Sequence, residues 1–419
     1  MSESNITLVY HKNNIIDICL LWVIFILSPF VAALLALYFI YYRRHVRLGV
    51  IIIIMFWGLV GYTFLPADTM DITRHNLAFE NLKNVNSFAD FVFYQSLSEK
   101  PDWFLDLVFW GIGKWVYTHQ IVGFLGAVCY YGLGLGTLLN WRDQLQTKSS
   151  FNNFILPVLM FLSLAQVTEF SGMRQGNAIL LFLFIVTIPD IRLSIYKKCI
   201  CLIFPCLLHF SMYPIVLFYI CTCFLSRRVL LTISLFLLMS YWYFVPLMAS
   251  LMNVLTSLGG IGSGIADKID VYMFQGEVEA ALYSGSVLRF YVILLMMFVF
   301  PFIALVVDKK RKQFPQFILR LHYWGIMFFS YIVFTASSYT LSRNIMLFKM
   351  FGVLYFTYAL FSCSLGRYLS KFIMYICLFV IVLFPFFLIL GKEYMVLNTK
   401  VFYSSLIDLI NINTQPEGY

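Results

Sequence analysis

Long runs of apolar residues constrain this chain more than any other feature. The run from Ile18 to Tyr42 contains no charged side chain, and several later runs are similar. An α-helix rises about 1.5 Å per residue, so about 20 such residues cross the ~30 Å hydrocarbon core of a bilayer. Hydrophobic residues make up 61% of the 419 positions and charged residues 12%, which is far more apolar than a soluble globular protein. The sequence therefore predicts an all-α, polytopic integral membrane protein.

The basic residues lie in short clusters between the apolar runs. Lys and Arg accumulate in the cytoplasmic loops of membrane proteins, so these clusters mark the cytoplasmic side. We therefore interpret the net charge of +9 as a topology signal and expect no nucleic-acid partner. The clusters are Arg43, Arg44 and Arg47; Arg142 and Lys148; Arg192, Lys197 and Lys198; Arg227 and Arg228; Lys309, Lys310, Arg311, Lys312 and Arg320; and Arg367 and Lys371.

These markers predict about ten transmembrane helices. The first apolar run is too long for a signal peptide and is interpreted as a retained span, and the basic cluster after it places the N-terminus outside. Ten crossings place the C-terminal tail outside as well. The expected spans are 17–42, 48–65, 119–139, 152–168, 172–190, 229–251, 286–307, 322–340, 345–365 and 372–391.

No internal repeat or low-complexity linker divides the chain, which favours a single polytopic domain over residues 1–419. Two polar segments, at about 66–101 and 252–285, are expected to form periplasmic loops. The second contains the glycine run 259–264, which lacks the Gly-Lys-Ser/Thr ending of a phosphate-binding loop. We interpret that run as a flexible loop.

Residues 102–118 are apolar, but the segment is short and carries Asp102, Asp106 and Lys114. A crossing there would move the Arg142–Lys148 loop to the outside and break the charge rule. The segment is therefore expected to be an interfacial or re-entrant helix on the outer side.

Residues 199–225 have cytoplasmic markers at both ends, so this run must enter and return on the same side. Each arm is too short for a full crossing, which predicts a re-entrant hairpin with Leu208-His209-Phe210-Ser211 near its tip. Pro205 and Pro214 are expected to break the arms, as in the broken helices that line many membrane sites. One long tilted helix is the alternative.

The nine cysteines lie in or beside apolar segments, so a disulfide framework is not expected. Cys199/Cys201 and Cys221/Cys223 form two C-x-C pairs, but no histidine stands at metal-ligand spacing from them. The sequence therefore favours small apolar roles for these cysteines over a metal site.

An acid and a base interrupt the apolar sequence at Glu169-Phe170-Ser171-Gly172-Met173-Arg174-Gln175. A charge at such a boundary loses hydration and persists where a cavity, a partner or a ligand compensates it. Ser171 is a natural N-cap, which places Arg174 and Gln175 in the first turn of the helix at 172–190. Backbone N–H groups at a helix start, together with a guanidinium, favour a bound phosphate. The structural alternative is an arginine that anchors its helix at the membrane interface.

A second helix start of the same kind is expected at Ser342-Arg343, with Ser342 as the cap. Both first turns point to the outer membrane face, so the two helix starts suggest a diphosphate site. Interfacial anchoring is again the alternative for Arg343.

Other titratable residues allow a functional and a structural interpretation. Asp71 and His75 would share a face of a helix (i, i+4), so the acid could orient and charge the ring, unless the cluster arose by chance in a polar loop. His209 is set in apolar sequence, where an imidazole either acts in a site or simply hydrogen-bonds the backbone. Lys349, inside the ninth expected span, is costly unless it faces a wet cavity.

Several patches resemble the EpsG/Wzy-type polysaccharide polymerases, which include bacterial O-antigen polymerases, between about residues 60 and 360. The most specific is Arg174-Gln175 with Ala178 shortly after it, followed about 35 residues on by His209-Phe210-Ser211. The other patches are Asp71-Ile72-Thr73-Arg74-His75, Glu99-Lys100-Pro101-Asp102-Trp103, Ser171-Gly172-Met173-Arg174-Gln175-Gly176-Asn177-Ala178 and Ser342-Arg343. After Glu99 the chain has Lys-Pro-Asp where the family pattern has Pro-Gly.

The resemblance implies a GT-C-like glycosyltransferase of the bacterial inner membrane that acts at the periplasmic face in lipopolysaccharide biosynthesis. A glycan on undecaprenyl diphosphate would move as a block onto the terminal sugar of another lipid-linked repeat unit. The implied partners are this lipid-linked oligosaccharide and membrane lipid, and the resemblance leaves room for a chain-length regulator. No cofactor is implied, and the absence of an evident metal cage predicts metal-independent transfer.

The candidate site residues fit this chemistry by type. Cations and amides would bind the leaving diphosphate, and an acid or imidazole would take the proton of the acceptor hydroxyl. The diphosphate candidates are Arg174, Gln175, Arg343 and Arg74. The candidates for the general base are His209, Glu169, Asp71 and His75, with Glu99 and Lys349 as further site residues.

Three other functions stay open at this point. An O-antigen ligase also handles lipid diphosphates, but usually has a larger periplasmic loop between late spans. A transporter or flippase of lipid-linked oligosaccharide would use broken helices too, and internal symmetry between the halves would favour it. A membrane scaffold would use Arg174 only as a lipid anchor.

Overall fold

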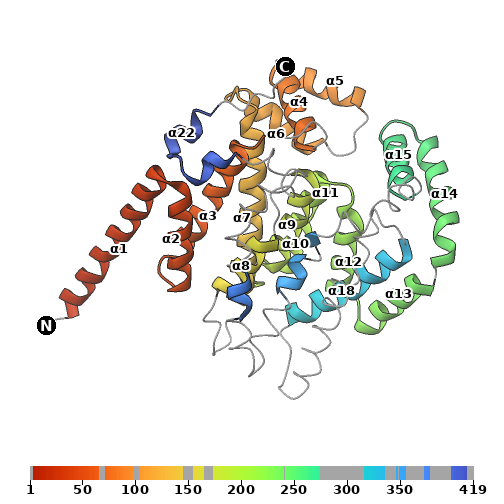
Figure 1. The fold of residues 1–419 in the computed structure, drawn as a ribbon. Helices are drawn as coiled ribbons and strands as arrows, with labels where there is room; N and C mark the ends of the chain where they lie inside the picture. Colours follow the sequence, from red (N-terminus) through yellow and green to blue (C-terminus); the bar gives the residue numbers. More distant parts are fainter. Residues whose placement is uncertain are drawn as a thin grey trace. The chain divides into compact units, whose positions relative to one another are not determined.

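The computed structural model describes residues 3–65, 71–98, 103–144, 154–164, 173–239, 241–273, 316–335, 346–347, 349–354, 372–377 and 398–412. Every regular element in these ranges is a helix, which confirms the all-α prediction for them (Figure 1). The helices are α1 (Glu3–Leu27), α2 (Pro29–Tyr41), α3 (Val46–Tyr62), α4 (Asp71–Lys83), α5 (Phe88–Ser98), α6 (Phe104–Gly113), α7 (Gln120–Gln144), α8 (Ile155–Leu164), α9 (Met173–Thr187), α10 (Ile195–Cys201), α11 (Ile203–Leu208), α12 (Met212–Phe224), α13 (Arg227–Met239), α14 (Tyr241–Ser257), α15 (Ile261–Met273), α18 (Gln316–Thr335), η4 (Thr399–Phe402) and α22 (Leu406–Ile410).

Apolar helices predominate, but they differ in length. Among the described helices, α7 with 25 residues is long and apolar enough to cross a membrane in one piece. The other apolar helices have 10–17 residues. Helices α3, α7 and α9 fall on the expected spans 48–65, 119–139 and 172–190. Their crossing of a bilayer stays a prediction.

The chain forms two compact units. Unit 1 consists of residues 1–84, 111–173 and 371–419, and unit 2 consists of residues 85–110 and 174–370. Each has its own core of large buried side chains, among them Tyr131 and Trp141 in unit 1 and Phe182 and Trp324 in unit 2.

The first expected span is two helices of unit 1. α1 ends at Leu27 and α2 begins at Pro29, because proline has no N–H to continue a helix and its ring clashes with the carbonyl four residues earlier. Ser28 between them is extended (φ −157°, ψ 96°), and its Oγ accepts a hydrogen bond from the Val31 N–H at 3.5 Å. The two helices pack against each other as a hairpin (Figure 1). The prediction of one span over 17–42 is therefore wrong.

The hairpin also changes the expected position of the N-terminal end of α1. Asp17 Oδ2 lies 3.9 Å from His45 Nε2, and His45 belongs to the basic segment 43–47. This part of α1 therefore lies at the same end of unit 1 as the basic segment. The charge rule that assigns residues 43–47 to the cytoplasm assigns this end of α1 to the same side, contrary to the expected outside N-terminus.

α3 and α7 pack backbone against backbone through small residues. A Cβ added to Gly61 would lie 2.2 Å from the carbonyl oxygen of Gly123, and a Cβ added to Gly123 would lie 2.2 Å from that of Gly61. Only hydrogen fits at both places, so the two helices approach as closely as glycine-rich membrane helices do. On the same pair of helices, Trp57 stacks on Tyr131 with ring centroids 4.5 Å apart.

The C-terminal segment 398–412 packs on the end of unit 1 where α3 ends and α7 begins. Gln120 Nε2 donates hydrogen bonds to the carbonyl oxygens of Ile412 (2.8 Å) and Tyr62 (3.2 Å). Tyr62 Oη donates to the carbonyl oxygen of Ile410 at 3.4 Å. Because α3 begins beside the basic segment and ends here, the C-terminal segment lies at the opposite end of unit 1. This position agrees with the expected outside tail, whose sidedness stays a prediction.

Unit 2 is built around the fully buried ring of Trp324 in α18. It stacks on Phe351 (centroids 4.6 Å apart) and packs against Phe182 of α9 (5.4 Å). Its Nε1–H donates to the carbonyl oxygen of Ile215 in α12 at 2.9 Å, which satisfies the indole donor inside the core. Phe182 also meets the ring of Tyr219 in α12 edge-on at 5.8 Å. Helices α9, α12 and α18 therefore share one core.

α10, α11 and α12 form the helical hairpin that the charge pattern predicts over 199–225. α10 and α11 make the first arm, α12 makes the return arm, and His209 lies in the turn between them. Pro205 breaks the first arm, because its missing N–H leaves the carbonyl of Cys201 without a helical partner. Pro214 lies in the first turn of α12 and, contrary to expectation, does not break that arm. One long helix is excluded, and the re-entrant path stays a prediction.

Two further expectations concern residues 102–118 and 229–251. α6 within 102–118 has 10 residues, about 15 Å, which is too short to cross a ~30 Å core and agrees with an interfacial helix. The expected span 229–251 falls on α13 and α14, which run in different directions (Figure 1). A single span over 229–251 is therefore wrong. The expected span 286–307 lies outside the described residues, as do most of 345–365 and 372–391.

The two expected periplasmic loops contain helices. Residues 66–101 hold α4 and α5, and residues 252–285 hold the end of α14 and all of α15. Within the glycine run, Gly259 and Gly260 have positive φ (65° and 51°), which forms the turn between α14 and α15. The rest of the run lies inside α15, so the flexible-loop interpretation is wrong.

Replacing Gly123 by alanine is expected to destabilise the protein by about 1–3 kcal/mol, because the new Cβ would overlap the backbone of α3. Gly132 lies in the same helix, and a Cβ there meets nothing nearer than 3.9 Å. Gly132→Ala should therefore leave stability unchanged or slightly raised, since alanine favours helix. Thermal unfolding of both purified variants in detergent measures the difference, and equal melting temperatures would contradict the close approach of α3 and α7.

Candidate functional site

Arg174 and Gln175 lie in the first turn of α9, as the sequence predicts, because α9 begins at Met173. The side chain of Arg174 is half-buried, whereas Gln175 is 7% exposed. Gln175 lies on the same face of α9 as Phe182 (i, i+7), so it is directed to the core that α9 shares with α12. The expected cap Ser171 lies outside the described residues.

Asn177 is a third polar residue at this end of α9, and sequence reasoning did not single it out. It is 7% exposed, and its Oδ1 is enclosed without a hydrogen bond from the part of the chain that the structure describes. A helical side chain leans back over the preceding turn, so Asn177 covers the turn that carries Arg174 (i, i+3). An enclosed acceptor of this kind is costly unless a donor reaches it.

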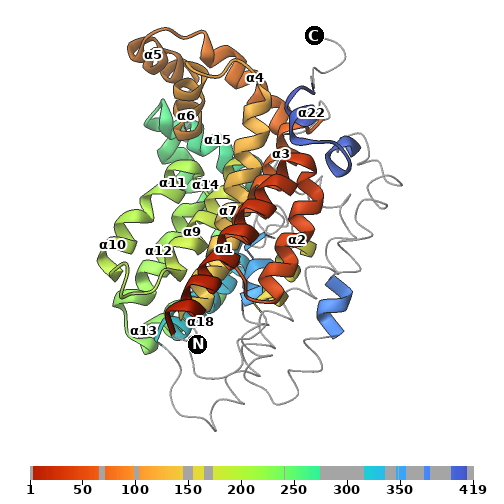
Figure 2. The ribbon, with the colours of Figure 1, turned by 90° about the vertical axis from the view of Figure 1, so that its left-hand side faces the viewer.

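His209 lies at the same end of unit 2 as this turn. The first arm of the hairpin returns the chain from the end of α9, so α9 and α12 run parallel, with their register fixed by Phe182 and Tyr219. Gln175 lies two turns, about 10 Å, before Phe182, and Met212 lies equally far before Tyr219. His209 directly precedes this part of α12, and both views show α11 leading away from α10 toward that end (Figures 1 and 2).

The imidazole of His209 is buried, at 6% exposure, and held in one orientation by its own turn. Its Nδ1 lies 2.7 Å from Ser211 Oγ and accepts a hydrogen bond from the backbone N–H of Ser211 at 3.3 Å. The ring also stacks on Phe210, with centroids 5.0 Å apart. His209 is therefore a fixed polar group at the tip of an apolar hairpin.

Asp71, Arg74 and His75 lie together on α4 in unit 1. The helix confirms that Asp71 and His75 share a face, but the carboxylate of Asp71 forms an ion pair with Arg74 (i, i+3). His75 is 7% exposed, whereas the side chain of Arg74 is 75% exposed. The acid expected to orient the ring is thus engaged by a guanidinium.

Sequence reasoning missed a second ionic group on α4. Glu80 pairs with Lys83 and lies 4.0 Å from Nδ1 of His119, just before α7. The i, i+3 spacing of Glu80 and Lys83 was the available signal. Lys83 Nζ also donates to the carbonyl oxygen of Tyr117 at 3.4 Å, so this group joins α4 to the start of α7.

The remaining candidates are only partly described. Lys349 lies in the helical segment 349–354, half-buried, just before Phe351, which stacks on Trp324. Glu99, Glu169 and Arg343 lie outside the described residues. The structure therefore brings Gln175 and His209 to one end of unit 2 and places the Asp71 group in unit 1.

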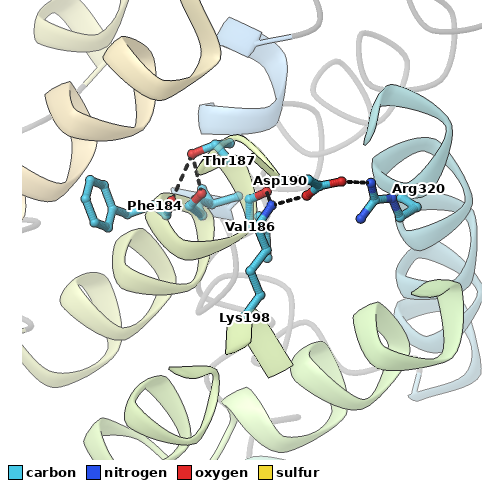
Figure 3. A network of polar contacts seen from close by, with 7 residues as sticks. Phe184, Val186, Thr187, Asp190, Lys198 and Arg320 are labelled. Atoms are coloured by element: carbon cyan, nitrogen blue, oxygen red, sulfur yellow. Dashed lines mark hydrogen bonds and ion pairs between the residues drawn. The ribbon is translucent and has the colours of Figure 1, made fainter. Parts of the chain in front are cut away.

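At the opposite end of unit 2, Asp190 binds two cations from different helices (Figure 3). Lys198 Nζ of α10 lies 2.7 Å from Asp190 Oδ1 and 3.4 Å from the carbonyl oxygen of Val186, and Arg320 of α18 pairs with Oδ2. Lys198 is 0% exposed. Burial alone raises the pKa of the Asp190 carboxyl, but hydrogen bonds and charge from Arg320 and Lys198 outweigh it and hold the pKa below its ordinary value.

We call Asp190, Lys198 and Arg320 the Asp190 clamp. It ties the turn after α9 to α10 and α18, and so fixes one end of unit 2. Sequence reasoning treated Lys198 and Arg320 only as topology markers and did not consider Asp190. The available signal was a single acid, directly after Pro189, in a loop that is otherwise basic.

Comparison of the chain with protein-family models, with curated proteins and with solved structures gives no significant match. In the described part of the chain, no group of three or more His, Cys, Asp or Glu side chains has the arrangement of a metal site. The eight described cysteines are free thiols. Metal-independent transfer stays a prediction.

Asp190→Asn should destabilise the protein more than Lys198→Met. The first change leaves a fully buried ammonium without its carboxylate, at a cost of about 1–3 kcal/mol. The second removes the buried charge itself, while the partly exposed Asp190 keeps Arg320. Melting temperatures in detergent give the order. A protein that tolerates Asp190→Asn as well as Lys198→Met would show that the clamp does not hold Lys198 as described.

Proposed function

We propose that this protein is a polytopic membrane glycosyltransferase of the bacterial inner membrane that polymerises repeat units of a surface polysaccharide such as O-antigen. The observation that carries the proposal is the polar first turn of α9, with Arg174 and Gln175, at the same end of unit 2 as His209. These residues also make up the most specific motifs of the EpsG/Wzy resemblance. The proposed site faces the periplasm.

Exposed apolar stripes support a bilayer environment. Large hydrophobic side chains at helical spacing are exposed along single faces of several helices, which a soluble surface rarely allows. In a bilayer, lipid tails cover these side chains and remove the free-energy cost of exposing them to water. This explains why the helices are apolar on outward faces as well as in the core. Such stripes are Leu20, Val23 and Leu27 on α1, and Leu231, Leu235 and Met239 on α13.

The chemistry of the α9 turn suits a lipid diphosphate. The first N–H groups of a helix have no helical acceptor, so they and the helix dipole attract phosphate oxygens. Arg174 adds a guanidinium that can bind two oxygens at once. Asn177 adds an enclosed acceptor beside it, which a sugar hydroxyl next to the diphosphate would satisfy. A diphosphate-linked sugar matches all three features.

In the proposed reaction, the bond between the anomeric carbon of the donor glycan and its diphosphate oxygen breaks. The hydroxyl oxygen of the acceptor's terminal sugar forms the new glycosidic bond and gives its proton to a general base. Undecaprenyl diphosphate leaves, and cationic groups such as Arg174 stabilise its charge. His209, Glu169 and the Asp71/His75 pair are the base candidates from sequence.

The test uses purified protein and lipid-linked repeat unit isolated from host cells that lack this gene. With repeat unit alone, the proposal predicts a ladder of products that differ by one repeat. A single product formed only when lipid A core is added would indicate a ligase. Movement of the lipid across proteoliposomes without a new glycosidic bond would indicate a flippase. Either result from folded protein would overturn the proposal.

Arg174→Lys should shorten the ladder strongly, because lysine keeps the charge but loses the bidentate geometry. Loss of one charge-assisted hydrogen bond of about 1.5–3 kcal/mol corresponds to a drop in rate of about tenfold or more. Arg192→Lys, an exposed position at the other end of unit 2, is the matched control and should behave as wild type. Equal effects of the two substitutions would remove Arg174 from the proposed site.

A further inference from the structure

We propose that His209 acts in this transfer as a hydrogen-bond donor through Nε2–H, and that another group takes the proton of the acceptor hydroxyl. The inference rests on the proposed function, since it names the role of one residue in that site. It is carried by the two contacts that Ser211 makes with the other ring nitrogen, Nδ1.

The backbone N–H of Ser211 points at Nδ1 of His209, 3.3 Å away, and a backbone amide can only donate. Nδ1 must therefore present its lone pair. A proton on Nδ1 would face the amide proton and leave that amide without an acceptor. The hydroxyl of Ser211, 2.7 Å from Nδ1, rotates freely and can donate to the same nitrogen. In the neutral ring, the single proton then lies on Nε2.

The turn at residues 209–211 holds the imidazole of His209 in one orientation. Backbone hydrogen bonds from Met212 to the carbonyl of His209 (3.1 Å) and from Tyr213 to the carbonyl of Phe210 (3.1 Å) fix the backbone around Ser211. The imidazole stacks on Phe210 and is 6% exposed. Turning the ring over would put a carbon in place of Nδ1 and lose both contacts with Ser211.

A donor at Nε2 has a defined use in the proposed reaction. As the bond from the anomeric carbon breaks, negative charge grows on the leaving diphosphate oxygen, and a fixed N–H donor stabilises it more than it stabilises the substrate. A base needs a lone pair on the nitrogen that faces the hydroxyl, and Nε2 in this tautomer has none. The proton of the acceptor hydroxyl passes instead to a separate base, for which a carboxylate is the natural choice.

The tautomer itself can be measured without any substrate. Protein labelled with ¹⁵N-histidine, with His209 assigned by the loss of its signals in His209→Gln, should show a directly bonded proton on Nε2 and none on Nδ1. The chain has six histidines, so the spectrum is simple enough to assign. A proton found on Nδ1 of His209 in the wild type would overturn the inference, whatever the protein's activity.

Two nearly isosteric substitutions separate donor from base in the ladder assay. Gln places an amide N–H close to the position of Nε2, and Glu places a carboxylate oxygen there. The inference predicts that His209→Gln loses less than about tenfold in rate, while His209→Glu loses about a hundredfold or more, as for a lost oxyanion donor. The reverse order would identify His209 as the base and contradict the proposal.

Ser211→Ala is the matched control, because it removes the hydroxyl and keeps the backbone N–H that fixes Nδ1. The ¹⁵N spectrum of this variant should still show a proton on Nε2 of His209 and none on Nδ1, because the backbone N–H alone requires the Nδ1 lone pair. A proton on Nδ1 in this variant would mean that the hydroxyl and not the backbone N–H sets the tautomer, and would count against the inference.

These results are distinguishable from a failure of the proposed function. If wild-type protein has the Nε2–H tautomer but makes no ladder, the polymerase proposal fails and the tautomer stands as a structural feature. If wild-type protein makes a ladder and His209→Glu is the more active variant, the polymerase proposal stands and the donor role fails. Melting temperatures of each variant exclude loss of folding as the cause.

Discussion

A buried charge in an apolar chain must be paired, and in unit 2 that requirement is met by Asp190. Its carboxylate binds Lys198, which has no access to solvent, and also Arg320 from a helix more than a hundred residues later. Because the buried ammonium of Lys198 has lost its hydration, any arrangement that separates it from Asp190 has a high free energy. The clamp therefore fixes where α10 begins relative to the end of α9.

The position of the candidate site follows from this clamp by helix geometry. α10 and α11 together are about as long as α9, so the chain that leaves Asp190 reaches His209 near the level at which α9 begins. The ring contact of Phe182 with Tyr219 and the Trp324 core then hold α12 and α18 alongside. The polar first turn of α9 and the imidazole of His209 therefore lie at one end of unit 2, and the basic loop after α9 lies at the other end.

Much of the fold and of the candidate site could be predicted from the sequence. The first turn of α9 is predicted correctly because polar residues interrupt the apolar sequence there. The hairpin tip at His209 is predicted correctly because basic clusters lie at both ends of residues 199–225. The single span over 17–42 failed because hydropathy does not register that Pro29 starts a new helix with Ser28 as its cap. Asp190 was missed because its partners are brought together by the fold, and Asn177 because an enclosed acceptor is visible only in three dimensions.

In the proposed function, the polar turn of α9 opens to the outside of the membrane and the Asp190 clamp lies on the cytosolic side. Single cysteines at positions 174 and 192, in a background in which the nine native cysteines are replaced, can be probed in spheroplasts with a membrane-impermeant maleimide. The account predicts that position 174 reacts in intact spheroplasts, whereas position 192 reacts only after permeabilisation. The opposite pattern would place the proposed diphosphate site in the cytosol and contradict the account.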